Sequence, residues 1–389
     1  MNSVDEVDKK ALRVVLVTAG EPHNAGLVVS IGKLVSTLNS IGATVRLITR
    51  CDTERVAEIG ADRIVLLPYR SPGIIGFIRG QLDCTHAILR LHRDEPIDVI
   101  FFAFGSDLSL LPVFVGRRFT RRIVLRSDGR PSLVYVRYLS GCRNIKWLCF
   151  RGLEKAVYSR VDLLLTENEF MIEDNCFSHN ASVSTGPLFL DLDRFAPKIS
   201  PSQRMYELCY IGTLSKEKGV LDFIETLSRI EQRYPGIRAL VCGDGDCREL
   251  IISSIEEAGL SETVTLTGWI DHEEVAQYLN QSRMLVLPSQ REGLSNIVLE
   301  AMACGTLVLA RPVGGIPGVV IDGVTGYHIR SPGPIGICDA IERAIGDQDG
   351  ETCRTRARSR IESEFSKHVV TTHYRHLFQT IGLNPDVNE

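Results

Sequence analysis

The stretch from residue 283 to 329 constrains the fold more than any other part of this 389-residue chain. An apolar run at residues 284–287 is long enough for a buried strand, and Pro288 ends it. After a polar loop, the pattern at residues 297–304 predicts a short helix, and residues 307–310 supply another apolar run. The stretch therefore predicts a strand, loop, helix, strand unit.

Both ends of the predicted helix carry boundary signals. Ser295 or Asn296 is the expected N-cap, and Gly305 stands where a C-terminal glycine belongs. The N–H groups of the first turn, up to about Val298, have no acceptor inside the helix, so together with the helix dipole they form an anion site. Gly293, just before this turn, allows close approach of a ligand to the backbone. This arrangement suits a ligand that carries a diphosphate.

Two glutamates, Glu292 and Glu300, flank the start of this helix. Glu292 lies in the loop at the expected anion site. Glu300 lies about one turn inside the helix, where a carboxylate accepts hydrogen bonds from the hydroxyl pair of a sugar. The alternative is that Glu292 is a surface acid and Glu300 a solvated helix residue, and the spacing alone leaves both open.

The whole stretch resembles the donor-binding segment of glycosyltransferase family 4 (glycosyl transferase group 1), the retaining enzymes with a GT-B fold. The motifs of that family are a P-S-x-x-E-G loop, an E-x₇-E pair, A-M-A-x-G, a Gly-Gly turn and D-G-x-T-G. In this chain they stand as Pro288-Ser289 with Glu292-Gly293, Glu292 with Glu300, Ala301-Met302-Ala303 with Gly305, Gly314-Gly315, and Asp322-Gly323 with Thr325-Gly326. The resemblance extends more weakly over nearly the whole chain. It implies sugar transfer from a nucleotide sugar.

The resemblance also implies an α/β fold of the GT-B type, with two Rossmann-like parallel-sheet domains facing across a cleft. The length of the chain agrees with two domains. We expect residues 1–195 to form the N-terminal, acceptor-side domain and residues 205–366 the C-terminal domain that binds the nucleotide-sugar donor. A polar, proline-containing segment at about 195–204 is the expected linker. The last helix, 367–384, is expected to pack on the first domain.

The N-terminal residues predict a βαβ unit. An apolar run at residues 13–18 is followed by a helical pattern from Leu27 to Leu38 and by a second strand that begins at Val45. Such a unit implies a right-handed crossover and a parallel sheet, with ligands bound at the carboxyl end of the strands. Family members carry Gly-Gly in the loop between strand and helix, and here only Gly26 matches. A simple β–α turn is the alternative.

The loop at residues 212–219 follows the first strand expected in the second domain. In the family this loop carries an arginine and a lysine that pair with the diphosphate. Lys218 matches the lysine, but Thr213 stands at the arginine position, and Lys216 is a possible substitute as a point charge on a flexible stem. Lys218 is therefore the candidate for stabilising the leaving group. The alternative is an exposed lysine at a helix start.

After the strand that ends at Leu125, many family members carry a histidine that contacts the sugar. This chain has Ser127 or Asp128 at that place. Asp128 can accept a hydrogen bond from a sugar or acceptor hydroxyl, but it cannot donate as a neutral imidazole does. By resemblance, the expected catalytic residues are Lys218, Glu292 and Asp128. The expected donor-binding residues are Gly26, Thr213, Lys218, Gly243, Gly268, Gly293, Leu294, Ser295, Asn296, Ile297 and Glu300.

Composition excludes several classes of protein. The apolar fraction of 44% and the charged fraction of 24% are those of an ordinary globular protein. The start of the chain is polar and acidic, unlike a secretory signal, and the apolar region at 97–115 is too interrupted to span a membrane. The 11 cysteines are scattered without a C-x₂-C pair, which indicates reduced thiols, a cytoplasmic location and no zinc site.

Charge is distributed unevenly along the chain. Residues 1–160 hold 24 Lys and Arg against 15 Asp and Glu, whereas the remainder holds 20 against 33. The richest basic run is 117–130. We hypothesise that this half faces an anionic membrane surface at the inner face of the membrane, or a phosphate-bearing lipid acceptor. Solvated surface charge is the alternative. Nucleic acid is not an expected partner, since no recognisable binding motif accompanies the basic residues.

These observations predict a metal-independent hexosyltransferase without a cofactor, whose partners are a nucleotide sugar and a glycan or lipid-linked acceptor. A catalytically inactive nucleotide-sugar-binding homologue is one alternative, favoured by Thr213 and by the absent histidine. A GT-B nucleotide-sugar epimerase and a nicotinamide dehydrogenase are further alternatives, the latter resting only on the glycines at 243 and 245. Lys218, Glu292 and Glu300 favour the transferase.

Overall fold

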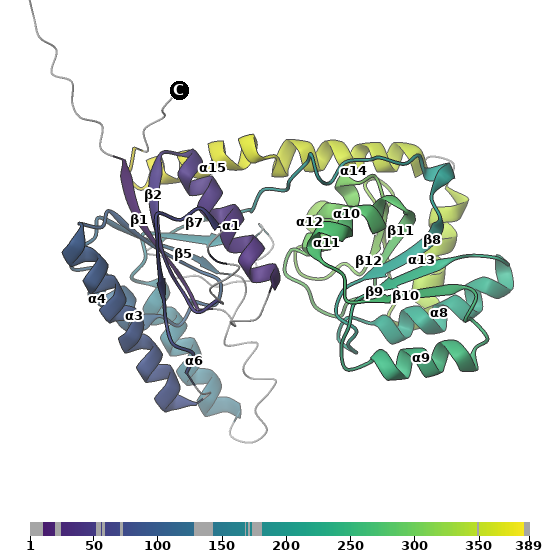
Figure 1. Cartoon of the computed structure of the whole chain (residues 1–389), viewed down its shortest axis with the longest axis horizontal. Coiled ribbons are helices and arrows are strands. Elements are labelled where there is room, and N and C mark those ends of the chain that lie inside the picture. The colour runs from purple at the N-terminus through teal and green to yellow at the C-terminus, as the bar shows by residue number, and fades with distance from the viewer. Residues whose placement is uncertain are drawn as a thin grey trace, which may run out of the picture. The chain divides into compact units, whose positions relative to one another are not determined.

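The structure is a computed structural model, and it describes residues 11–19, 25–51, 56, 59–70, 73–127, 143–167, 169, 172, 181–347 and 350–384. The chain divides into two compact units (Figure 1). Unit 1 comprises Met1–Phe189 and Lys367–Glu389, and unit 2 comprises Leu190–Ser366. No helix among the described residues is long and apolar enough to cross a membrane.

Unit 1 is built on a seven-stranded parallel sheet with the strand order β3-β2-β1-β4-β5-β6-β7. The strands are β1 (Leu12–Thr18), β2 (Ala43–Thr49), β3 (Arg63–Leu66), β4 (Val99–Ala103), β5 (Arg122–Ser127), β6 (Leu163–Thr166) and β7 (Ser182–Thr185). The helices are α1 (Ala25–Ser40), α3 (Ile74–Asp94), α4 (Leu110–Gly116), α6 (Arg143–Tyr158) and α15 (Lys367–Thr380).

Alternate residues of β1 enter two separate cores, as the period of two in a strand requires. Val14 and Leu16 pack with α1 and α15, whereas Val15 and Val17 pack with α3, α4 and α6. The sheet is thus covered by helices on both faces, which is why its strands are continuous apolar runs (Figure 1). Helix α15 comes from the end of the chain and is anchored in unit 1 by Tyr374, whose side chain is fully buried.

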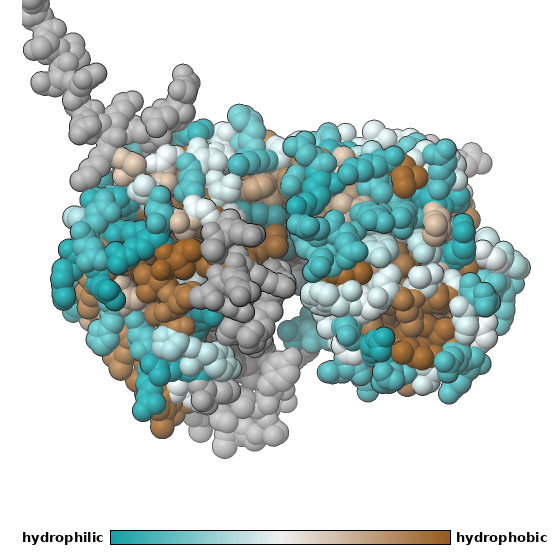
Figure 2. All heavy atoms as spheres, in the orientation of Figure 1, coloured by the Kyte–Doolittle hydropathy of each residue, from teal (hydrophilic) through white to brown (hydrophobic). Residues whose placement is uncertain are grey.

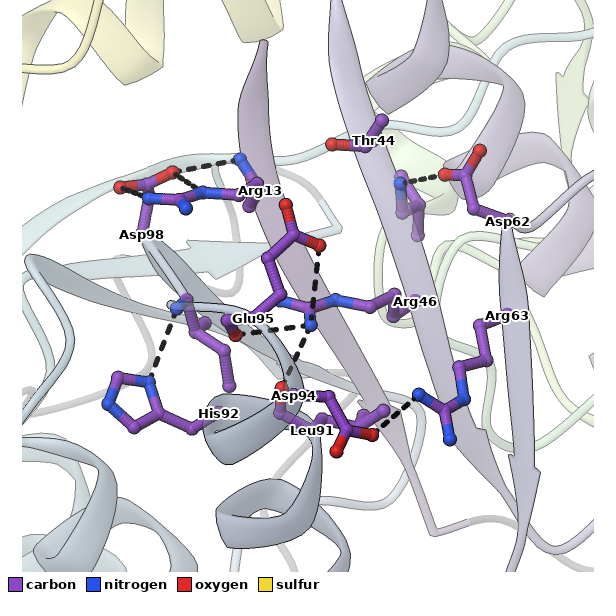
Figure 3. A network of polar contacts seen from close by, with 12 residues as sticks. Arg13, Thr44, Arg46, Asp62, Arg63, Leu91, His92, Asp94, Glu95 and Asp98 are labelled. Atoms are coloured by element: carbon purple, nitrogen blue, oxygen red, sulfur yellow. Dashed lines mark hydrogen bonds and ion pairs between the residues drawn. The ribbon is translucent and has the colours of Figure 1, made fainter. Parts of the chain in front are cut away.

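The amino-terminal edge of this sheet is closed by ion pairs (Figure 3). Arg13 at the start of β1 binds Asp98 through Nε at 2.9 Å and Nη2 at 3.1 Å. The buried guanidinium of Arg46 on β2 donates to the carbonyl of Leu91 at 3.0 Å, at the end of α3. The charged side chains at this edge are thus paired within unit 1 and stabilise it. Ligands of open α/β sheets bind at the opposite, carboxyl edge.

Unit 2 is built on a six-stranded parallel sheet with the order β10-β9-β8-β11-β12-β13. The strands are β8 (Tyr206–Ile211), β9 (Ala239–Cys242), β10 (Val264–Gly268), β11 (Ser282–Leu287), β12 (Leu307–Ala310) and β13 (Tyr327–His328). The helices are α8 (Val220–Arg233), α9 (Arg248–Glu257), α10 (His272–Asn280), α11 (Asn296–Ala303), α12 (Ile316–Val319), α13 (Gly333–Gly346) and α14 (Gly350–Phe365).

The segment 190–204, which the sequence placed in the first domain and in a linker, packs in unit 2. Phe195 is 1% exposed within the core of that unit. Arg204 is also buried, and its guanidinium donates to the carbonyl oxygens of Ser282 at 2.7 Å and Cys304 at 2.9 Å. The boundary between the units therefore falls earlier than the polar composition suggested, because a buried arginine ties this segment to unit 2.

Each sheet has one point at which the strand order reverses. In unit 1 successive strands run outward in opposite directions from β1 and β4, and in unit 2 they do so from β8 and β11. The helices that follow these two strands pack on opposite faces of the sheet, and open α/β sheets bind ligands at the carboxyl edge at this position. The topology alone thus marks one candidate ligand position in each unit.

Candidate functional site

The loops after β8 and β11 meet at the reversal point of unit 2. Lys218, which ends the first loop, donates through Nζ to Oε1 of Glu292 in the second loop at 2.8 Å. The side chain of Glu292 is only 9% exposed, while that of Lys218 is 32% exposed. Because an ammonium group carries three N–H donors and this pair uses one, the site offers further donors and positive charge to an anion.

These loops pack backbone against backbone, and glycines make this possible. A Cβ on Gly243 would lie 1.9 Å from the carbonyl oxygen of Gly212, and a Cβ on Gly314 would lie 1.9 Å from that of Glu292. Gly314 also has a φ of 58°, which side chains rarely adopt. Any larger residue at these two positions would displace the loops that carry Glu292 and the turn after β8.

Main-chain hydrogen bonds join the same loops. The N–H of Gly212 donates to Cys242 at 3.0 Å, and the N–H of Gly243 donates to Gly268 at 2.8 Å. On the other side, the N–H of Gly315 donates to the carbonyl of Gly293 at 2.7 Å. The turns after β8, β9 and β10 are therefore linked in a series, and the Glu292 loop is linked to the Gly-Gly turn.

Helix α11 begins directly behind Glu292. Ser295 is its N-cap, with φ −70° and ψ 116°, and its side chain makes no capping hydrogen bond. Asn296, the first helical residue, is exposed. The first-turn amides thus lack the side-chain acceptor that usually satisfies one of them, although the N–H of Val298 already donates to the carbonyl of Ser295 at 3.1 Å. The anion site stays a prediction.

Glu300 lies inside α11 and is 3% exposed, so it is not a solvated helix residue. Its Oε1 lies 2.8 Å from Nε2 of His272, the first residue of α10. The ring of His272 in turn lies against Phe195, with centroids 5.6 Å apart. The imidazole thus holds one oxygen of a buried carboxylate, and the hydrogen bond from Glu300 to a ligand hydroxyl stays a prediction.

The sequence did not predict His272 as a site residue. A signal was present, because Asp271 and Glu274 form a capping box that starts α10 directly after β10 and its turn. The first residue of a helix that follows a sheet strand lies near the carboxyl edge. Its pairing with Glu300 arises only when α10 and α11 come together.

The remaining predicted residues fall in three places. Thr213 is exposed in the loop after β8, and its carbonyl accepts the hydroxyl of Tyr210 at 2.8 Å. Leu294 and Ile297 are half-buried against the core of unit 2. Gly26 lies in unit 1, in the first turn of α1, where its carbonyl accepts from Ser30 at 3.0 Å. The predicted catalytic residue Asp128 lies outside the described residues.

The D-G-x-T-G motif organises the turn before β13. Asp322 accepts from the main-chain N–H of His328 at 2.7 Å and from Arg330 and Arg343 at 2.6 and 3.0 Å. Burial alone would raise the pKa of Asp322, but these three donors outweigh it and lower the pKa to about 2. The motif therefore stabilises the turn before β13, the edge strand of the sheet.

The basic run at 117–130 does not form one solvated surface in the described part of the chain. Arg117 pairs with Asp162, and Arg122 donates to the carbonyl of Ile381. Arg126 is 2% exposed and donates to the carbonyl of Gly186 at 2.9 Å. Half of the six arginines of this run thus serve the packing of unit 1.

Metal-ligating side chains do not gather in the ranges that the structure describes. No group of three or more His, Cys, Asp or Glu there is placed to hold a metal ion. Lys218 and the start of α11 carry positive charge at the reversal point of unit 2.

Residues 193–362 match the family model described as glycosyl transferases group 1. Over 177 residues the chain is 31% identical to a glycogen synthase of Mycobacterium tuberculosis, an alignment that covers 45% of this chain and 42% of the relative. Over 277 residues it is 28% identical to a GDP-mannose-dependent alpha-(1-6)-phosphatidylinositol monomannoside mannosyltransferase of Mycolicibacterium smegmatis, covering 66% of this chain and 69% of the relative. The chain thus spans less than half the length of the first of these relatives.

Among solved structures, the chain is similar to Anabaena HepE in complex with UDP. The TM-score is 0.72 at 17% identity, and the alignment covers 95% of this chain and all of HepE. The predicted α/β fold of the GT-B type is confirmed by this likeness and by the two parallel sheets.

Proposed function

The chain belongs, through residues 193–362, to the glycosyl transferases group 1 family, and from this premise we propose that it is a retaining hexosyltransferase. It transfers a hexose-type sugar from a nucleoside-diphosphate sugar to a glycan or lipid-linked acceptor. The observation that carries the proposal is the pairing of Lys218 with Glu292 at the reversal point of the sheet, directly before the open start of α11. Relatives that use GDP-mannose or are solved with UDP support a nucleotide-sugar donor.

The reaction breaks the bond between the anomeric carbon and the diphosphate oxygen, and the electron pair of that bond leaves with the diphosphate. Negative charge therefore grows on the leaving group, where Lys218 and the amides of Ser295 and Asn296 are positioned to stabilise it. Positive charge grows on the sugar ring, beside which the carboxylate of Glu292 lies. The acceptor oxygen forms the new bond on the same face, and its proton passes to the leaving phosphate. No metal ion or separate general base is needed in this scheme.

Glu300 binds the nucleoside in this proposal. Its buried carboxylate accepts hydrogen bonds from the ribose hydroxyl pair, and His272 holds it in place at 2.8 Å. A contact of this kind stabilises the ground state and the transition state equally, so it sets donor affinity rather than the rate of the chemical step.

A cytoplasmic location with peripheral contact to the membrane belongs to the same proposal. The nine cysteines in the described ranges are all free thiols, and eight of them are buried. Free thiols fit a reducing compartment.

Turnover of the donor tests the proposal. The protein is incubated with UDP-, GDP- and ADP-sugars, and the released nucleoside diphosphate is measured. We expect release from one nucleotide class, and Lys218→Met should lower it about 100-fold while donor affinity falls much less. Arg229→Met, which removes an exposed charge on α8, is the matched control and should leave turnover unchanged. Equal losses of affinity and turnover in Lys218→Met would contradict the leaving-group role.

One alternative has a specific observation in its favour. Thr213 stands where the family carries a second diphosphate-binding cation, which favours an inactive protein that binds nucleotide sugars. Saturable binding of a donor without any release of nucleoside diphosphate would establish this alternative.

A further inference from the structure

The reversal point of unit 1 holds a large cavity. Its volume is about 910 Å³, within the range of roughly 300–1,000 Å³ that is usual for small-molecule sites. The walls come from the ends of β1 and β2, from the β4–α4 loop, and from α3 and α6. Apolar side chains predominate, and they include Val17, Leu67, Phe77, Leu108 and Leu153.

Most polar groups of this cavity already have partners. The hydroxyl of Thr18 donates to Thr49 at 2.8 Å. The side chain of Gln81 donates to the carbonyl of Leu108 at 3.2 Å and accepts from the N–H of Leu111 at 3.2 Å. These bonds are internal, so both side chains already have partners within unit 1.

Arg50 is different. It follows β2 at the carboxyl edge and lines the cavity, and its Nε is buried without a hydrogen-bond partner. Asp83, the nearby acid, is bound by Arg70 instead, at 2.7 and 3.0 Å. The guanidinium fits because Gly80 has no side chain, since a Cβ there would lie 2.4 Å from Nη2 of Arg50. Arg50 as a whole is half-buried, but its Nε is enclosed, and it forms no ion pair with a described acidic side chain. A cation placed in this way in an apolar cavity fits an anionic group of a ligand.

A second hollow of about 490 Å³ adjoins the cavity and shares Phe77, Ile78, Gln81 and Leu153 with it. It runs between α3, α4 and α6. Figure 2 shows hydrophobic atoms gathered on the part of unit 1 where α3 lies in Figure 1. The exposed apolar residues of this surface are Ile74, Ile75, Phe77, Ile78, Leu82 and Phe114.

Cations lie at the outer end of this apolar surface. The guanidinium of Arg118 lies 4.2 Å from the ring centre of Phe114, and that of Arg160 lies 6.0 Å from it. Such a combination of exposed apolar and cationic side chains suits the boundary of an anionic lipid layer.

We propose that this cavity binds a lipid phosphate, with the phosphate at Arg50 and the hydrocarbon chain leaving along α3 towards Phe114. The phosphate then lies at the carboxyl edge of the sheet, and the chain occupies the hollow between α3, α4 and α6. The inference rests on the proposed function only where the bound lipid is taken to be the sugar acceptor. Binding itself requires no nucleotide, so the two can fail separately.

Decyl phosphate, kept below its micelle-forming concentration, is the probe. Calorimetric titration of the full-length protein should show saturable binding, whereas inorganic phosphate and the neutral decyl maltoside should bind at least about tenfold more weakly. Arg50→Gln should weaken decyl phosphate binding about tenfold or more, and Ile78→Asn should weaken it as well. Circular dichroism verifies that each variant is folded.

Two exposed residues of α3 outside both hollows supply the matched controls. Arg90→Gln and Leu89→Asn remove the same kinds of group and should bind as the wild type does. Absence of saturable binding, equal losses in Arg50→Gln and Arg90→Gln, or equal affinity for decyl maltoside would each overturn the inference. A protein that binds decyl phosphate but turns over no sugar donor would keep this inference and contradict the proposed function.

Discussion

The carboxyl edges of the two sheets share a topology but differ in their chemistry. In unit 2 the loops at the reversal point are polar, rich in glycine and joined by main-chain hydrogen bonds around Lys218 and Glu292. In unit 1 the corresponding position is an apolar cavity lined by the half-buried Arg50, whose Nε has no hydrogen-bond partner. The carboxyl edge of unit 2 thus presents hydrogen-bond donors and charged groups, whereas the carboxyl edge of unit 1 presents mainly apolar side chains. The comparison teaches that the strand order locates a site, while the loop residues decide what it binds.

The largest expected effect concerns the loops of unit 2. Gly314→Ala places a Cβ 1.9 Å from the carbonyl of Glu292 at a φ of 58°, so we expect the free energy of unfolding to fall by roughly 3 kcal/mol. Gly323→Ala is the control, because its φ is 74° but a Cβ there would touch nothing, and it should cost only about 1 kcal/mol. Urea unfolding followed by circular dichroism measures both. Equal losses would show that close packing of the loops is not what Gly314 provides.

The next largest change in the free energy of unfolding is expected for Asp322. Its pKa in the folded chain is about 2, below its ordinary value, so its contribution to stability is complete above about pH 4 and is lost as the pH falls towards 2. Asp322→Asn should therefore destabilise the protein by about 2 kcal/mol at pH 7. Near pH 2 the difference should vanish. Asp339→Asn, on the exposed side of α13, is the control; a loss in Asp322→Asn that persists unchanged at low pH would refute the account.

A substitution of Asp107 in unit 1 should change the free energy of unfolding by a smaller amount and in the opposite direction. Asp107 is 3% exposed, and burial raises its pKa to about 6, although the hydroxyl of Tyr158 donates to it at 3.1 Å. Because the folded state holds this proton more tightly, stability falls as the pH rises from about 4 to 6. Asp107→Asn should thus gain about 1 kcal/mol at pH 7 and nothing at pH 4, measured by urea unfolding. A variant that is less stable than the wild type at both pH values would disprove this.

The sequence predicted the strands of both sheets well, since strands covered by helices on both faces are continuous apolar runs. The runs at 13–18 and 284–287 lie within β1 and β11, and the run at 307–310 coincides with β12. The stretch 283–329, from which the family resemblance was predicted, lies within residues 193–362, which match the family model.

Helix α3 was not predicted, and the reason is physical. Its first turns expose Ile74, Ile75 and Ile78 while Cys84 and Ile88 are buried, so its apolar residues extend well beyond the face that packs on the sheet. The unpredicted helix is the one that carries the apolar surface of unit 1. A departure from simple amphipathic pattern thus coincides with the surface for which we infer a ligand.

Only part of the candidate site could be predicted from the sequence. Spacing within one segment indicated Glu292 and Glu300, because both lie on the same loop and helix. The contact of Glu300 with His272 joins residues 28 positions apart on two helices, and the cavity around Arg50 joins the ends of several elements. Such pairings depend on packing between elements, which no local pattern records.

The central claim, that unit 2 holds a nucleoside diphosphate through Lys218 and Glu300, is tested most directly by calorimetric titration. UDP-, GDP- and ADP-sugars are titrated into the wild type and into Glu300→Ala, with Glu256→Ala on the exposed side of α9 as the control. We predict that one nucleotide class binds, that Glu300→Ala weakens this binding by roughly 1–3 kcal/mol, and that the control binds as the wild type does. Unchanged donor affinity in Glu300→Ala, or no binding of any nucleotide sugar by the wild type, would contradict the account.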